Sequence, residues 1–153
     1  VGQGSINTAF SPIQTLGGST VTLLAPAGDI VAGLTTPPRR PIGIQTLRGG
    51  AVRAYLDGDL SINQGKVLTA QGGDILLYTS GGSIDAGRGA LTSRTTTPPR
   101  VSRDAQGNLV FEFSVDVAGS GIRSATSDPD GPGPLGPPPA GDVYLFAPRG
   151  VID

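Results

Sequence analysis

The chain has 153 residues with 25 Gly, 14 Pro, a formal net charge of −1, and no Cys, His, Met or Trp. Without Cys and His, disulfides, thiol catalysis and Ser-His-Asp chemistry are excluded, and without a concentrated basic face nucleic acid is not an expected partner. No apolar run approaches the ~18 residues of a membrane-spanning helix, so we expect no membrane insertion. Patterned Val, Ile and Leu runs between Gly, Pro and Asp turns favour one all-β domain over residues 1–153.

A sequence motif that occurs four times is the strongest feature of the chain. Each copy opens at a glycine, runs through a short apolar segment of period two, turns at a second glycine and enters a shorter apolar segment. The copies are GSTVTLLAPAGDIVAG (18–33), GAVRAYLDGDLSIN (50–63), GDILLYTSGGSIDAG (73–87) and GDVYLFAPRGVID (141–153). We interpret the corner glycines as positions of positive φ, and the aspartates beside them as partners of the turn backbone. These aspartates are Asp29, Asp59, Asp74 and Asp142.

Stacking these copies would bury their apolar rows and pair their open edges, so the repeat predicts a parallel β-solenoid. The spacing indicates a coil of roughly 20–25 residues, and hence about five or six coils. Tyr55, Tyr78 and Phe146 occupy matching positions. We interpret them as a stacked ladder on the solenoid rather than as a platform for sugars.

Three segments interrupt the repeat and are expected to form insertion loops, at 34–41, 91–118 and 127–140. The first two contain Thr-Thr-Pro-Pro-Arg, and Pro-Pro favours extended backbone that leaves a sheet. The alternating segment LVFEFSVDV (109–117) predicts a half-buried strand that forms a hairpin with 101–103 over the solenoid. The predicted lateral contacts with neighbouring fibres are Thr35, Pro37, Pro38, Arg39, Thr96, Pro98, Pro99 and Arg100.

Candidate residues for chemistry are few. Asp57 and Asp59 flank a turn glycine, and we interpret them as turn residues rather than as a carboxylate pair for glycoside cleavage. Asp128 and Asp130 in SDPDGPG are weak calcium candidates, because oxygen ligands beside a glycine turn suit a hard cation but the later ligands of an EF-hand loop are missing. We therefore predict no enzyme, no catalytic residue, no metal and no cofactor.

Three segments taken in order resemble a known family. They are GGDILLYTSGGSIDAGRGA (72–90), GSGIRSATSDPD (119–130) and GDVYLFAPRGVID (141–153). They resemble a region of the filamentous-haemagglutinin-like exoproteins, the large secreted partners of bacterial two-partner secretion, and the similarity extends from Leu16 to Asp153. The resemblance implies a right-handed parallel β-helix, export to the surface of a Gram-negative cell, and an extended fibre used in adhesion or contact. It does not imply catalysis.

The two ends of the chain, when joined, match an interior motif. GVID (150–153) followed by VGQGSI (1–6) aligns with GSIDAGRGAL (82–91). This alignment predicts that another copy completes the final half-motif, either as a covalent tandem repeat or as a separate subunit in an open filament. The predicted assembly interface consists of Val1, Gly2, Gly4, Ile6, Val143, Leu145, Gly150, Ile152 and Asp153.

We therefore predict a structural segment or subunit of a secreted bacterial surface fibre that stacks head to tail through its solenoid ends. The alternative is an adhesin module whose projecting loops at 34–41 and 91–139 bind glycans or host or microbial surfaces. A polysaccharide-cleaving β-helix enzyme is a remote alternative, since it would need a charge cluster on one face and the charges of this chain are scattered.

Overall fold

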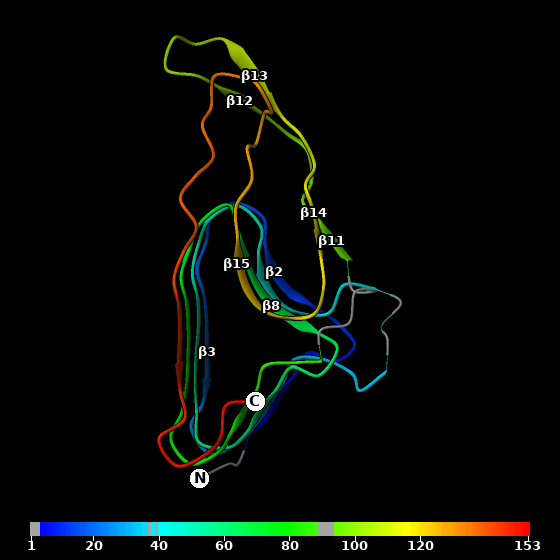
Figure 1. Ribbon diagram of the computed structural model, residues 1–153, viewed down its shortest axis with the longest axis vertical. Coiled ribbons are helices and arrows are strands. Elements are labelled where there is room, and N and C mark those ends of the chain that lie inside the picture. Colours follow the sequence, from blue (N-terminus) through cyan, green and yellow to red (C-terminus); the bar gives the residue numbers. More distant parts are fainter. Residues whose placement is uncertain (1–3, 37, 39, 89–93) are drawn as a thin grey trace.

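The computed structural model describes residues 4–36, 38, 40–88 and 94–153 (Figure 1). These residues form strands and turns and no helix, and twelve of the strands make three parallel sheets of four strands each. The all-β prediction is confirmed. The parallel sheets are compatible with the β-solenoid that the repeat predicts.

Each sheet takes one strand from each of four successive coils. Sheet A contains β1 (Ile6–Asn7), β4 (Ile30–Val31), β7 (Leu60–Ser61) and β10 (Ile84–Asp85). Sheet B contains β2 (Ile13–Thr15), β5 (Gly43–Thr46), β8 (Lys66–Ala70) and β15 (Gly121–Ala125). Sheet C contains β3 (Val21–Ala25), β6 (Val52–Leu56), β9 (Ile75–Thr79) and β16 (Val143–Phe146). The chain passes through A, B and C in that order in every coil.

The described residues form four coils, and a bridge from Ile152 to Ile84 begins a fifth. The expectation of five or six coils is therefore wrong. Its cause is the long segment between β10 and β16, where much of the chain lies outside the stack and contributes only β15 to it.

The core lies between the three sheets, where equivalent apolar side chains stack in rows. Ile30 and Leu60 of sheet A, Ile44 of sheet B, and Val52 and Ile75 of sheet C are all 0% exposed. Burying one such side chain contributes about 1.5–3 kcal/mol, so the two central coils supply most of the stabilising apolar contact.

The second glycine of each repeat permits close approach between coils. A Cβ at Gly82 would lie 2.2 Å from the carbonyl oxygen of Gly58 in the preceding coil. Neither glycine has a positive φ, so the predicted conformation is wrong at these corners. Positive φ occurs instead at the opening glycines Gly18, Gly50 and Gly73, with φ of 84, 86 and 95°.

A ladder of side-chain oxygens connects the coils at these corners. In each step an oxygen of one coil accepts a hydrogen bond from the N–H of the equivalent residue in the next coil. The pairs are Ser5 with Asp29 (3.1 Å), Asp29 with Asp59 (2.9 Å), Asp59 with Ser83 (2.7 Å), Ser83 with Val151 (3.1 Å) and, at another corner, Asp74 with Asp142 (2.9 Å). The predicted turn aspartates Asp29, Asp59 and Asp74 therefore fasten neighbouring coils.

Between β10 and β15 the chain leaves the stack, and we call residues 94–119 the excursion. Its strands are β11 (Arg94–Thr96), β12 (Arg100–Arg103), β13 (Leu109–Glu112) and β14 (Asp116–Ala118). β11 pairs antiparallel with β14 beside sheet B, and β12 pairs antiparallel with β13 further out, at the end remote from both termini (Figure 1).

The alternating segment 109–117 forms two strands rather than one, with a break between Glu112 and Asp116. Val110 and Val117 are buried, whereas Leu109, Phe111 and Phe113 are exposed. The largest residues of the alternating pattern thus face solvent.

Candidate assembly edge and excursion

The edge formed by the fourth coil and residues 150–153 exposes side chains whose equivalents in the central coils are buried. Val143 in β16 is equivalent to Val52 and Ile75, which are 0% exposed, yet it is 42% exposed itself. Ile152 is equivalent to Ile84 and is 45% exposed, against 0% for Ile84. The apolar rows therefore continue to this edge without a cover among the described residues.

The backbone at this edge points outward in the same repeating pattern. The N–H of Val52 donates to the carbonyl of Asp74 in the next coil (2.9 Å), and the N–H of Ile75 donates to Asp142 (2.8 Å). The same geometry directs the N–H of Val143 toward the place of a fifth strand. An edge with open backbone groups and an apolar row is a template for another strand.

At the opposite edge, formed by β1, β2 and β3, the valine equivalent to Val143 is more deeply buried. Ile6, Ile13 and Leu23 are only partly buried and pack against the core, while Val21 is buried. Gly4 approaches the backbone of the next coil, since a Cβ at Gly28 would lie 2.4 Å from its carbonyl oxygen.

The register of the two ends differs from the predicted junction. Ile6 pairs with Ile30 in sheet A, and Ile152 is bridged to Ile84 in the same sheet. Residues 4–7 and 150–153 therefore occupy the same position in their coils. Residues 4–7 of another copy would not follow residues 150–153 as the next part of one coil. The alignment of the joined ends with 82–91 is wrong by this register; Val1 and Gly2 lie outside the described residues.

A nearly buried ion pair fastens the excursion to the solenoid. Arg48 Nη1, at the corner between sheets B and C, pairs with Glu112 of β13, and Nη2 of the same guanidinium donates to the carbonyl of Pro98. The two side chains of the ion pair are 9% and 12% exposed. One guanidinium thus holds both a strand and a loop of the excursion.

The excursion also buries a lysine on the outer face of sheet B. Lys66 of β8 is buried, and its Nζ donates to the carbonyl of Val117 in β14 (3.1 Å). Desolvation, with a smaller contribution from the charge of Arg123, lowers the pKa of Lys66 to about 8. The neutral form is therefore accessible under mildly alkaline conditions.

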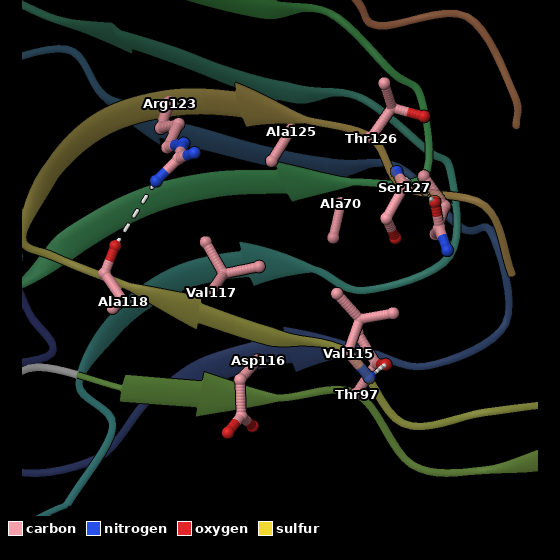
Figure 2. Close-up of a pocket in the computed structure, with 11 residues that line it drawn as sticks. Ala70, Thr97, Val115, Asp116, Val117, Ala118, Arg123, Ala125, Thr126 and Ser127 are labelled. Atoms are coloured by element: carbon pink, nitrogen blue, oxygen red, sulfur yellow. Dashed lines mark hydrogen bonds between the residues drawn. The ribbon is translucent and has the colours of Figure 1, made fainter. Parts of the chain in front are cut away.

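A cavity of about 370 Å³ lies between sheet B and β14. Figure 2 shows Ala70, Arg123 and Ala125 of sheet B opposite Val117 and its neighbours. The small alanines leave the space open, and Arg123 closes one side by donating to the carbonyl of Ala118 (3.3 Å).

Comparison with known proteins identifies a family at this point. A family model described as filamentous haemagglutinin family outer membrane protein matches residues 72–153, more than half of the chain. The chain belongs to this family. The matched region contains β9 of the third coil, the whole fourth coil, the excursion and the exposed edge, and over these residues the resemblance read from the sequence is confirmed. No curated protein and no solved structure matches.

The lateral-contact residues of this haemagglutinin-family chain lie apart from one another. Thr35 is exposed and Pro38 partly buried in the segment between β4 and β5, while Pro37 and Arg39 lie outside the described residues. Thr96, Pro98, Pro99 and Arg100 are exposed on the excursion. Two of these are also engaged internally, since Thr96 bonds to Asp116 and Pro98 bonds to Arg48.

The two calcium candidates differ in environment. Asp128 is exposed, whereas Asp130 is buried. Across the described ranges, no group of three or more acidic, His or Cys residues is placed to hold a metal. No helix in the described part of the chain is long and apolar enough to cross a membrane.

Sequence reasoning missed sheet B as a repeating element, and with it Lys66 and Arg48. The four strands of sheet B read IQT, GIQT, KVLTA and GIRSA. They have no alternation of apolar and polar residues, because both faces of the central strands are buried. A glycine at the equivalent positions Gly43 and Gly121, opposite Lys66, was the available signal.

Proposed function

We propose that this chain is a structural segment of a secreted surface fibre of a Gram-negative bacterium. In this proposal a parallel β-solenoid, carrying a hairpin-like excursion and Pro-rich loops, is continued beyond its fourth coil by further strands. The observation that carries the proposal is the 42% exposure of Val143 at the end of a row whose inner members are fully buried. The family description as an outer membrane protein supports the location.

The register limits how the stack continues. Residues 150–153 already occupy the sheet A position of the fifth coil. A second copy placed directly on this edge would bring its own residues 4–7 to the same position, and the two segments would compete. The segment that continues the stack is therefore expected to add one strand to sheet B and one to sheet C, which completes the coil begun by residues 150–153. Direct stacking of identical copies would require either residues 150–153 of one copy or residues 4–7 of the other to be displaced.

Hydrogen exchange of single amides tests the proposal. In the chain of 153 residues alone, the N–H of Val143 should exchange rapidly, whereas the N–H of Ile75 should be protected by its bond to Asp142. In the native fibre, the peptide that contains Val143 should become as protected as the peptide that contains Ile75. Equal, rapid exchange of the Val143 peptide in the chain and in the fibre would refute the continued stack.

A second candidate function is adhesion through the excursion, and its support is the placement of the cavities. The three described cavities, of about 370, 260 and 470 Å³, are all lined in part by the excursion. Glycans or surface proteins are the expected ligands. Removing the whole excursion would uncover Leu68 and Lys66, so the sharper test is Phe111→Ser with Phe113→Ser, two exposed positions. Adhesion should fall while the fibre persists; unchanged adhesion would oppose this function.

A further inference from the structure

One carboxylate oxygen in the segment between β15 and β16 lacks a partner. Asp130 is 7% exposed, and its Oδ2 accepts a hydrogen bond from the N–H of Leu135 (3.2 Å). Its Oδ1 is buried, and no described residue donates a hydrogen bond to it. A buried carboxylate oxygen is strongly unfavourable unless a proton, a donor or a cation satisfies it.

The chain closes around this carboxylate. A Cβ at Gly133 would lie 1.9 Å from Asp130 Oδ2, so a larger residue at position 133 would displace the Asp130 side chain. Gly131 turns the chain next to Asp130 with a φ of 65°. Pro129, the residue before Asp130, accepts a hydrogen bond from the N–H of Phe113 (2.8 Å), which fixes the loop against β13.

Asp130 also lines a cleft that is bordered by the turn between β12 and β13. Asp104, Asn108 and Asp130 all line this cleft of about 470 Å³. Asn108 Nδ2 donates to Asp104 Oδ2 (2.9 Å), so this bond uses the amide nitrogen of Asn108 and leaves its amide oxygen available. Asp104 Oδ1 accepts hydrogen bonds from the backbone N–H groups of Gln106 (2.9 Å) and Asn108 (2.8 Å), which orient this carboxylate.

We propose that Asp130 Oδ1 and the oxygens of the Asp104–Asn108 turn hold a calcium ion that fastens the loop to the hairpin. Calcium lies 2.3–2.6 Å from its oxygen ligands, closer than the 2.7–3.2 Å of a nitrogen donor. A bare cation therefore needs less room beside a buried oxygen than an ammonium or guanidinium group does. Two carboxylates completed by neutral oxygens and water are typical of extracellular sites with a Kd of about 10⁻⁴–10⁻³ M.

The test is a calcium titration of the 153-residue chain, followed by thermal unfolding and by amide NMR. At 10 mM CaCl₂ the site should be more than nine-tenths occupied, and Tm should rise by about 3–10 °C. The amide resonances of Gly131, Gly133 and Leu135 should shift, and those of the central coils should not. Asp130→Asn should abolish both responses, whereas Asp128→Asn, two residues away and exposed, should retain them.

Each alternative outcome overturns the proposal. No response of the native chain up to 10 mM CaCl₂ refutes the site, as does an equal response to MgCl₂ or to NaCl of the same ionic strength. If Asp130→Asn stabilises the chain without calcium and the native chain does not respond, a proton rather than a cation satisfies Oδ1. If Asp130→Asn fails to fold, the amide shifts of the native chain still locate the ion or exclude it.

Discussion

Sheets B and C belong to the same coils but meet different surroundings. The strands of sheet C alternate, with Val52, Ala54 and Leu56 buried and the residues between them exposed. The central strands of sheet B are buried at every position, because one face packs on the core and the excursion covers the other. The comparison shows that a solenoid wall becomes a two-layer structure where the chain folds back over it.

Because the excursion covers sheet B and leaves sheet C bare, the outer faces of the two sheets carry different side chains. On sheet C the outward row of Leu24, Tyr55, Tyr78 and Phe146 stacks in register and remains exposed. On sheet B the outward Leu68 joins Leu47 and Val117 in a second small core, beside Lys66. Substitutions on the two outer faces should therefore have very different consequences.

The largest difference is expected between two leucines. Leu68 is 1% exposed on the outer face of sheet B, whereas Leu24 is 67% exposed on the outer face of sheet C. Leu68→Ala should lower the free energy of unfolding by about 2–5 kcal/mol, and Leu24→Ala by no more than about 0.5 kcal/mol. Urea unfolding of both variants measures this. Equal losses would mean that the excursion does not cover sheet B.

Cutting the ion pair should loosen the cover and leave the stack intact. Arg48→Met removes the guanidinium that holds Glu112 and Pro98, and should cost about 2–3 kcal/mol because a carboxylate is left almost buried. Limited proteolysis should then cut the excursion before the coils. Arg53→Met, an exposed position on sheet C, is the matched control and should behave as the native chain.

Stability should depend on pH through Lys66. Its folded pKa of about 8 lies below the usual value of 10.5, so between these values the unfolded chain binds more protons than the folded chain. Stability therefore rises with pH across this window, by about 1–3 kcal/mol, and the cost of burying the charged amine is fully present below pH 8. Unfolding of the native chain and of Lys66→Met from pH 7 to 10.5 should show this rise only in the native chain. Parallel curves would contradict the burial of Lys66.

The smallest effect is expected on the bare face of sheet C. Tyr78→Ser removes one member of the stacked row and should cost about 0.5–1 kcal/mol, the value of a cross-strand contact on an exposed face. Thermal unfolding should show a correspondingly small decrease in Tm. A loss as large as that of Leu68→Ala would indicate that another layer covers sheet C.

The same contrast explains how far the sequence could be interpreted. Sheets A and C were predictable, because Val21, Val52, Ile75 and Val143 repeat at matching positions beside glycine corners. Sheet B was not, because a strand buried on both faces lacks alternation and its cover includes a residue 51 positions away. The predicted assembly residues of β16 do lie on the exposed edge. The junction register failed because GSI occurs at both 4–6 and 82–84, and only strand pairing shows that these are equivalent.

The most direct measurement of the central claim is fibre diffraction, or cryo-electron microscopy, of native surface filaments in which this chain has been located with an antibody fragment. We expect strands stacked along the filament axis with a spacing of ~4.8 Å that continues without interruption past Val143. A filament in which this chain forms a lateral domain, with its β16 edge facing solvent, would contradict the account.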